Sequence, residues 1–245
     1  MFLSFVGYVF HTAFRLLLRR EKFYTRTFFY QIYLVGIQAI PVVALLNFLV
    51  GMVTINQGIT TLSDYGLSDR APDALIPSYI RYFGGMITYL VISGRSGSAF
   101  AAEIGAMKLS LEVDALESMK INPTSAIIIP RILALICFMP ILVIVAIFFG
   151  ILGGGLMTKL QIDFSFIKYL QSVYDLLNFR VLSATLLKSL VFGTIIGFIG
   201  CFRGMCVHTH FKILGNMTTK AVVQCIFWTI VFDGMMSIYI TFLGI

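Results

Sequence analysis

The chain has 245 residues, and 59% of them are hydrophobic, which gives a mean hydropathy of +0.95. This content excludes an ordinary soluble domain, because one core could not bury so much apolar surface. We therefore expect one integral membrane domain over residues 1–245. The formal net charge of +7 does not point to nucleic acid, because Lys and Arg gather in the cytoplasmic loops of membrane proteins.

The N-terminal segment, residues 1–26, is predicted to form an amphipathic helix in the membrane interface. Its apolar run precedes the positive charges of Arg15, Arg19, Arg20 and Lys22, whereas a signal peptide carries its positive charges first. An interfacial helix whose arginines meet anionic lipid fits this order. The alternative is one arm of a short hydrophobic hairpin.

Five apolar segments follow, and each is long enough for a helix to cross the hydrocarbon core of a bilayer. They cover residues 28–55, 78–102, 124–157, 182–202 and 221–245. The predicted fold class is an all-α integral membrane protein with five transmembrane helices, an N-terminal interfacial helix and a short cytoplasmic coupling helix. Of the 18 Lys and Arg, 12 lie on the N-terminal side of the spans and the remaining 6 on the other. This bias predicts a cytoplasmic N-terminus and an outer C-terminus.

A polar segment lies between the second and third spans, where the apolar pattern stops. Ser110 is the predicted N-cap of a short helix, with acidic residues in its first turn and Lys120 in its last. Asn122 and Pro123 are predicted to end it, because the residue before a proline disfavours the helical conformation. We interpret the segment as a coupling helix that docks on a partner protein, and the alternative is a solvated loop helix. Its charged residues are Glu103, Lys108, Glu112, Asp114, Glu117 and Lys120.

Small residues are frequent just before this segment, between Gly94 and Ala102. Because small residues let membrane helices approach closely, we expect the cytoplasmic end of the second span to pack against a neighbouring helix. The spacing of Gly94 and Gly97 does not indicate a phosphate-binding loop, since no Gly-Lys-Ser/Thr follows it and no strand precedes it. The chain itself is not expected to bind ATP.

Ionisable residues within the apolar segments are few, and such residues tend to be paired or functional. Asp233 lies in the last span, and Lys188 is its predicted partner; a role of Asp233 in a cavity or in proton transfer is the alternative. His208 and His210 lie near Cys206, but their spacing does not favour a zinc site. We expect no metal, no other cofactor and no catalytic residue in the chain.

Four runs in the middle of the chain belong together: GRSGSA at residues 94–99, AEIGAM at 102–107, DAL at 114–116 and PR at 130–131. They resemble the MlaE/YrbE-type permeases, the membrane subunits of ABC transporters that work with MCE proteins. The resemblance implies that the chain is not an enzyme, that it pairs with a second copy of itself, and that a dimer of cytoplasmic ABC ATPases hydrolyses ATP for it.

The resemblance also implies an MCE-domain protein on the outer side and phospholipid as cargo. The lipid would move between the inner and outer membranes and so maintain the lipid asymmetry of the outer membrane. The expected location is the cell inner membrane, and the plastid inner envelope is the alternative, because the family also occurs there.

The chain departs from this family at the start of the second span. Many members carry Arg-Glu-x-Gly-Pro there, whereas this chain has RYFGG at residues 81–85. Without the acid, the guanidinium of Arg81 is available to a lipid phosphate, which it can bind bidentately. Snorkelling of Arg81 to the outer interface is the alternative. The predicted substrate-binding residues are Arg81, Tyr82, Asn47 and Gln57.

A secondary transporter of a hydrophobic small molecule is the alternative function. That class is expected to show internal repeats and ionisable groups at the bilayer midplane, and only Asp233 meets the second condition. An intramembrane enzyme acting on lipid is a third class, for which the sequence offers no candidate residues.

Overall fold

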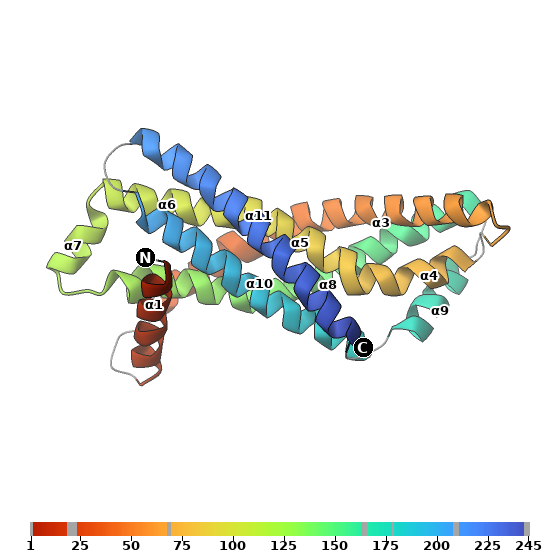
Figure 1. Ribbon diagram of the computed structural model, residues 1–245, viewed down its shortest axis with the longest axis horizontal. Coiled ribbons are helices and arrows are strands. Elements are labelled where there is room, and N and C mark those ends of the chain that lie inside the picture. Colours follow the sequence, from red (N-terminus) through yellow and green to blue (C-terminus); the bar gives the residue numbers. More distant parts are fainter. Residues whose placement is uncertain are drawn as a thin grey trace. The chain divides into compact units, whose positions relative to one another are not determined.

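The computed structural model describes residues 2–18, 24–67, 70–162, 166–177, 179–207 and 211–242. Within these ranges every regular element is a helix (Figure 1). Five helical segments are long and apolar enough to cross a membrane: Thr25–Ser63, Ala71–Leu109, Thr124–Ile162, Phe179–Met205 and Leu214–Tyr239. A shorter apolar helix, α1 (Phe2–Leu17), precedes them. The all-α membrane fold with five spans and an N-terminal helix is confirmed.

The spans are built from helical pieces that follow one another without a break. The first comprises α2 (Thr25–Gln31), η1 (Ile32–Gly36), η2 (Ile37–Ala39) and α3 (Ile40–Ser63). The second comprises α4 (Ala71–Ser78), η4 (Tyr79–Phe83), α5 (Gly84–Ile92), η5 (Ser93–Gly97) and α6 (Ser98–Leu109). The others are α7 (Glu112–Ser118), η6 (Thr124–Ile128), α8 (Ile129–Ile162), α9 (Phe166–Leu176), α10 (Phe179–Met205) and α11 (Phe211–Phe242).

Several helical segments extend beyond the apolar runs that predicted them: the first continues to Ser63, and the second begins at Ala71. The end of the last expected span, residues 243–245, lies outside the described residues. Arg19, Arg20 and Lys22, which belong to the predicted interfacial helix, and the pair His208 and His210 also lie outside them.

Four short π-helical segments interrupt the spans of the described chain: η1, η4, η5 and η6. A π turn adds a residue to one turn of the helix and is frequent at functional sites. Two of these segments follow a proline closely: Pro77 precedes η4, and Pro123 precedes η6. A proline has no backbone N–H to donate, so Pro77, inside α4, breaks the α-helical hydrogen-bond pattern just before η4. Pro123 stands at the N-cap of η6, where no helical hydrogen bond is lost.

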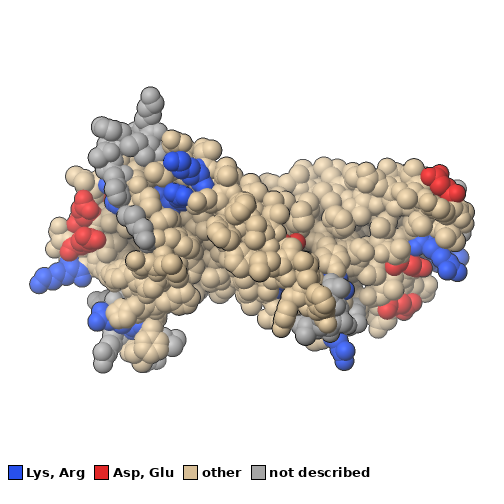
Figure 2. Space-filling view, viewed as in Figure 1, with Lys and Arg blue, Asp and Glu red and all other residues tan. Residues whose placement is uncertain are grey.

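The chain divides into two compact units. Unit 1 consists of Met1–Gln38, Leu90–Met139 and Leu190–Phe232, and unit 2 of Ala39–Tyr89, Pro140–Ser189 and Asp233–Ile245. On the face seen in Figure 2, most of the surface carries neither Lys, Arg, Asp nor Glu. Large hydrophobic side chains are exposed in the spans, among them Leu45, Phe148 and Phe227. Such a surface suits contact with lipid tails.

Unit 1 holds α1 against α10 through aromatic side chains. The rings of Phe2 and Phe202 lie 5.0 Å apart in an edge-to-face arrangement, and those of Phe10 and Phe198 stack at 5.7 Å. Deeper in the unit, a Cβ built on Gly200 would lie 3.0 Å from the carbonyl oxygen of Gly97. This close approach confirms that the small residues at the end of the second span pack against another helix.

Unit 2 is held by contact between the backbones of α3 and α8. A Cβ added to Gly51 would run into the carbonyl oxygen of Gly150, and one added to Gly153 would run into that of Phe48. No side chain fits between these two helices at their crossing. The contact explains why a run of glycines was selected here in the middle of an otherwise bulky apolar helix.

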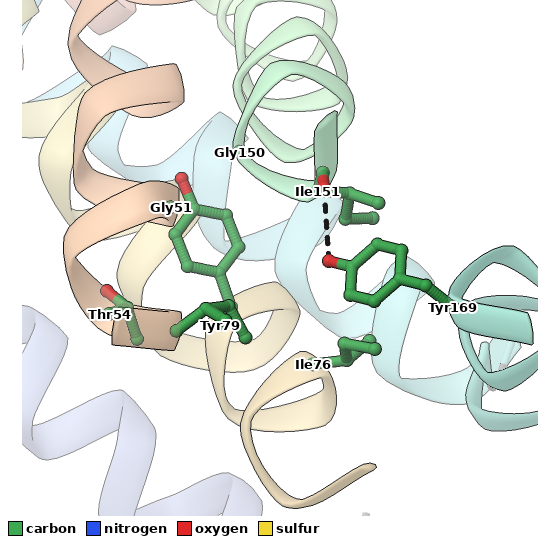
Figure 3. A pocket seen from close by; sticks show the side chains of 8 residues that line it. Gly51, Thr54, Ile76, Tyr79, Gly150, Ile151 and Tyr169 are labelled. Atoms are coloured by element: carbon green, nitrogen blue, oxygen red, sulfur yellow. Dashed lines mark hydrogen bonds between the residues drawn. The ribbon is translucent and has the colours of Figure 1, made fainter. Parts of the chain in front are cut away.

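Two tyrosines fill the space beside this crossing. Figure 3 shows Tyr79 and Tyr169 next to Gly51 and Gly150, and their rings leave a volume of only about 10 Å³. The Tyr169 hydroxyl donates to the carbonyl oxygen of Ile151 at 3.0 Å. Burial raises the pKa of the Tyr169 hydroxyl, so it keeps its proton and remains a donor. The pocket is part of the packing and has no room for a ligand.

Candidate functional site

A cluster of charged and aromatic side chains lies within unit 2, inside the spans. Lys188 is only 3% exposed, and its Nζ lies 3.4 Å from Oδ1 of Asp233. The same Nζ donates to the Ser237 hydroxyl at 2.9 Å. A single buried charge is unfavourable in an apolar region. The two opposite charges of Lys188 and Asp233 partly compensate each other's loss of solvation. The predicted pairing of Lys188 with Asp233 is confirmed.

The π segment η4 brings two predicted substrate-binding residues to this pair. Two cations lie near the ring of Tyr82. The guanidinium carbon of Arg81 is 5.2 Å from the ring centroid, and Nζ of Lys188 is 5.8 Å from it. Both distances permit attraction between a cation and the π face. Two cations and the Asp233 carboxylate leave the cluster with a formal charge of +1. An excess positive charge among apolar spans suits an anionic group.

The other two predicted substrate-binding residues are not part of this cluster. Asn47 is fully buried, and its Nδ2 donates to the carbonyl oxygen of Val43 at 2.9 Å. The Tyr79 hydroxyl lies 3.1 Å from the side-chain oxygen of Asn47. Gln57 is exposed ten residues further along α3, which is about 15 Å along the helix axis. Asn47 therefore joins helices in this structure, and its contact with lipid stays a prediction.

Sequence reasoning treated Lys188 as the partner of Asp233 alone. Its place beside Tyr82 depends on how three spans pack, and sequence distance does not reveal it. One signal was present, however: Arg81 and Lys188 are both cations within or near apolar segments, and such cations tend to line one polar path.

The predicted coupling helix is present as α7, but two predictions about its ends are wrong. Ser110 ends α6, and its hydroxyl donates to the Glu112 carboxylate at 2.9 Å, while Leu111 occupies the N-cap position without a side-chain cap. The helix ends at Ser118, before Lys120. Ser110, which was predicted to start the helix, instead belongs to the turn that ends α6.

Two residues in the left-handed region bracket α7. Leu111 has φ of 61° and Lys120 has φ of 59°, and they are the non-glycine residues with positive φ in the described chain. This conformation is unfavourable for residues with a Cβ. Such residues cluster at functional sites, where the surrounding structure holds them in place.

The surface of α7 is both charged and apolar. Glu112, Asp114 and Glu117 are exposed, and so is Lys120 just after the helix. Two large apolar side chains at its ends are also exposed, Leu111 at 63% and Met119 at 69%. Figure 1 shows α7 as a short separate helix between α6 and the start of the third span. A partner protein could therefore contact exposed charges along α7 and one exposed apolar side chain just beyond each of its ends.

The remaining two predicted coupling residues lie on α6, and each contacts another helix. The Glu103 carboxylate forms an ion pair with the buried Arg131, with 2.9 Å between Oε2 and Nη2. Lys108 donates to the carbonyl oxygen of Met205 at 2.6 Å. Sequence reasoning missed the partnership of Glu103 with Arg131, because the two residues are 28 positions apart and meet only when α6 packs against the third span.

The Glu103–Arg131 pair lines a groove of about 810 Å³ within unit 1. Residues of α2, α6, α7 and the third span form its walls, among them Tyr30, Met107, Glu112 and Leu116. The groove therefore runs from the exposed helix α7 to the ion pair inside the unit. A partner that contacts α7 would reach the same surface.

Comparisons with known proteins give one family model and several relatives. The family model described as permease MlaE matches residues 28–239, from the first span to the last. A probable ABC transporter permease protein of Rickettsia typhi is 33% identical over 194 residues, which cover 79% of this chain and 75% of the relative. A probable ABC transporter permease protein of Synechocystis is 34% identical over 193 residues, or 79% of this chain and 73% of the relative.

A more distant relative comes from a plant. The Arabidopsis thaliana protein named TRIGALACTOSYLDIACYLGLYCEROL 1, chloroplastic, is 28% identical over 218 residues, which cover 89% of this chain and 62% of the relative. The names of the bacterial relatives are those of ABC transporter permeases, and they lend no support to a secondary transporter.

Proposed function

We propose that this chain, which belongs to the MlaE permease family, is the phospholipid-carrying membrane subunit of its ABC transporter. Membership makes the chain a multi-pass membrane permease of the ABC transporter class. The proposal adds the cargo, the site that meets it, and the partners. ATP is hydrolysed in this scheme by a separate cytoplasmic ATPase dimer that contacts α7.

The observation that carries the proposal is the cluster of Arg81, Tyr82 and Lys188 in unit 2. A path for phospholipid needs apolar walls for the tails and a few polar groups for the headgroup. The guanidinium of Arg81 meets the phosphate, Tyr82 offers a hydroxyl, and Lys188 adds positive charge beside them. Gln57, exposed on α3 in the first span, is a further polar residue that we propose contacts the lipid.

The proposed partners follow the resemblance set out above. A second copy of the chain completes the permease, and an MCE-domain protein receives or delivers lipid on the outer side. The Arabidopsis relative carries a glycerolipid in its name, which supports a glycerolipid cargo. Maintenance of outer-membrane lipid asymmetry from the cell inner membrane is the proposed role, and a plastid inner envelope is the alternative location.

The proposed coupling surface consists of α7 and the groove beneath it. Glu112, Asp114, Glu117 and Lys120 meet the ATPase directly, since they are exposed. Glu103 and Lys108 act from α6 by holding the third and fourth spans, through Arg131 and the carbonyl of Met205. A displacement of α7 by the ATPase would be transmitted through these contacts to the third and fourth spans.

Replacing Arg81 by alanine is expected to lower the amount of phospholipid that co-purifies with the permease roughly tenfold to hundredfold. The change removes a charge-assisted hydrogen bond, which contributes about 1.5–3 kcal/mol. Arg81→Lys is expected to lose less, because the charge stays while the bidentate geometry is lost. Mass spectrometry of the bound lipid, normalised to protein, measures the effect.

Arg70→Ala is the matched control for this experiment. Arg70 is exposed at the start of α4, in the same unit, so its loss removes the same charge without touching the cluster. Equal lipid content in Arg81→Ala and Arg70→Ala, with normal transport in both, would show that the cluster does not hold the cargo.

Reversing Glu112 and Asp114 to lysine together is expected to weaken binding of the ATPase subunit about tenfold or more, because like charges across an interface oppose association. The permease itself is expected to fold normally, since both side chains are exposed. Co-purification of the ATPase and lipid-stimulated ATP hydrolysis measure the change.

The double reversal Asp64→Lys with Asp73→Lys supplies the same change of charge at exposed positions in unit 2. It is expected to leave ATPase binding intact. If the two double variants lose the ATPase to the same extent, the effect comes from net charge and α7 is not the docking surface.

A further inference from the structure

A small polar pocket lies within unit 1, and the proposed function makes no use of it. Its volume is about 160 Å³, and it is lined by residues of the first and second spans. Four of the lining residues are apolar: Leu34, Val35, Ala99 and Phe100. The polar ones are Gln31, Gln38, Arg95, Ser96 and Glu103. A group of polar side chains within two membrane-spanning segments needs an explanation.

Three polar atoms of this pocket are buried and have no hydrogen-bond partner among the described residues. They are Oε1 of Gln31, Nη1 of Arg95 and Oγ of Ser96. Gln31 is 3% exposed and Ser96 is 2% exposed. Buried polar groups in proteins are nearly always hydrogen-bonded, and three that line one pocket point to a bound group that completes them.

The π segment η5 presents two of these atoms together. Arg95 and Ser96 are neighbours within it, so the guanidinium and the hydroxyl reach the same pocket. Nη2 of Arg95 donates to Oε1 of Gln38 at 3.3 Å, which orients the guanidinium and leaves Nη1 for a ligand. The arrangement offers a fork of N–H donors with a hydroxyl beside it.

The charges around the pocket select an anion with one negative charge. Glu103 lines the pocket, but its carboxylate is already paired with Arg131 at 2.9 Å. Arg95, Arg131 and Glu103 together carry a formal charge of +1. A guanidinium binds phosphate oxygens with two parallel hydrogen bonds. The amide of Gln31 can turn its NH₂ group to an acceptor, because the orientation of a glutamine amide follows its partners.

We propose that this pocket binds a phosphate group carrying one negative charge, such as the phosphodiester of a lipid headgroup. Arg95 and Ser96 donate to its oxygens, and Gln31 and Gln38 hold the site. The volume accepts a headgroup, while the tails of a lipid would lie outside the pocket. This site is formed by residues of unit 1 alone and is separate from the Arg81 cluster, so it adds a second headgroup contact to the proposed function.

The test uses the purified full-length chain in detergent micelles that contain a phosphatidylglycerol with a photoactivatable group on its headgroup. We expect the probe to label the segment Ser93–Gly97, and Arg95→Gln to lower this labelling about tenfold. Ser96→Ala is expected to lower it by a smaller factor, because one neutral donor is lost. A diacylglycerol with the same photoactivatable group and no phosphate is expected to leave the segment unlabelled.

Arg203→Gln is the matched control. Arg203 also lies in unit 1 and also donates to a glutamine, Gln224, at 2.7 Å, and its loss is expected to leave the labelling unchanged. If Arg95→Gln does not fold, Arg95→Lys replaces it, and a loss of labelling by several-fold is expected because lysine lacks the fork. Equal labelling by the two probes, or unchanged labelling in the Arg95 variants, would overturn the proposal and indicate a pocket that holds only water.

Two further measurements distinguish free phosphate from a lipid headgroup, and the Arg95 pocket from the Arg81 cluster. Millimolar inorganic phosphate that abolishes the labelling supports a phosphate site whose ligand is the free ion, and labelling that survives it supports the lipid headgroup. Labelling of Tyr79–Phe83 in the same sample reports on the Arg81 cluster. If that segment is labelled while Ser93–Gly97 is not, this inference fails and the proposed function stands; the reverse result contradicts the proposed cargo site alone.

Discussion

Replacing Lys188 by methionine is expected to lower the free energy of unfolding by about 3–5 kcal/mol. Lys188 and Asp233 are both buried, with 3.4 Å between Nζ and Oδ1, and removal of one partner leaves the other charge buried without compensation. Tyr82 would also lose a cation over its ring. Thermal or denaturant unfolding of the purified permease in detergent measures the loss.

The double variant Lys188→Met with Asp233→Leu distinguishes the loss of the whole ion pair from the loss of one partner. Replacing a buried ion pair by apolar residues of similar volume is often neutral or stabilising, so the double variant is expected to recover most of the lost stability. It is also expected to carry less phospholipid than the native chain if Lys188 contributes to the cargo site. A double variant as unstable as the single one would mean that Lys188 stabilises the fold through Ser237 and Tyr82, independently of Asp233.

Replacing Gly51 by alanine is the second large effect that we expect, a loss of about 1–3 kcal/mol or more in the free energy of unfolding. The added methyl group would meet the carbonyl oxygen of Gly150. Backbone cannot rotate away as a side chain can, so α3 and α8 must separate along their crossing. Unfolding of the variant in detergent and its yield from membranes measure the loss.

Gly234→Ala provides the control in the same unit. Nothing lies within 4 Å of a Cβ added there, and alanine favours a helix over glycine by about 1 kcal/mol. The control is therefore expected to be as stable as the native chain or slightly more so. Similar destabilisation of both variants would show that the α3–α8 crossing tolerates a side chain.

The five spans were predictable because a bilayer imposes a long apolar helix on any segment that crosses it. The pair of Lys188 and Asp233 was predictable for a related reason, since a buried charge among apolar residues requires an opposite one. Both predictions follow from the solvent that surrounds the chain. They needed no knowledge of which span lies next to which.

The details of the candidate sites depended on packing, and there the predictions were weaker. Asn47 was predicted to contact lipid because it is polar and lies in a span; the hydroxyl of Tyr79 from the second span contacts it, and its role toward lipid stays a prediction. Glu103 was grouped with the exposed charges of α7 by its position in sequence, whereas it pairs with Arg131. The Ser110 cap was wrong because the turn that ends α6 and the start of α7 share the same residues.

The π segments were outside the reach of sequence reasoning. Pro77 precedes η4, but nothing in the residues of η5 signals an extra residue in the turn. These two segments nevertheless present Arg81 and Tyr82 in one unit, and Arg95 and Ser96 in the other.

The two left-handed residues that bracket α7 have a mechanical meaning. For a residue with a Cβ, the left-handed region of the φ/ψ map is a small area with steep sides, so Leu111 and Lys120 have little torsional freedom in either direction. The connections on both sides of α7 are therefore stiff. A displacement applied to α7 would therefore pass into α6 and the third span with little lost to bending. Glycine at position 111 or 120 would have a wider range of allowed φ and ψ angles. The backbone at that position could then bend and absorb part of the displacement.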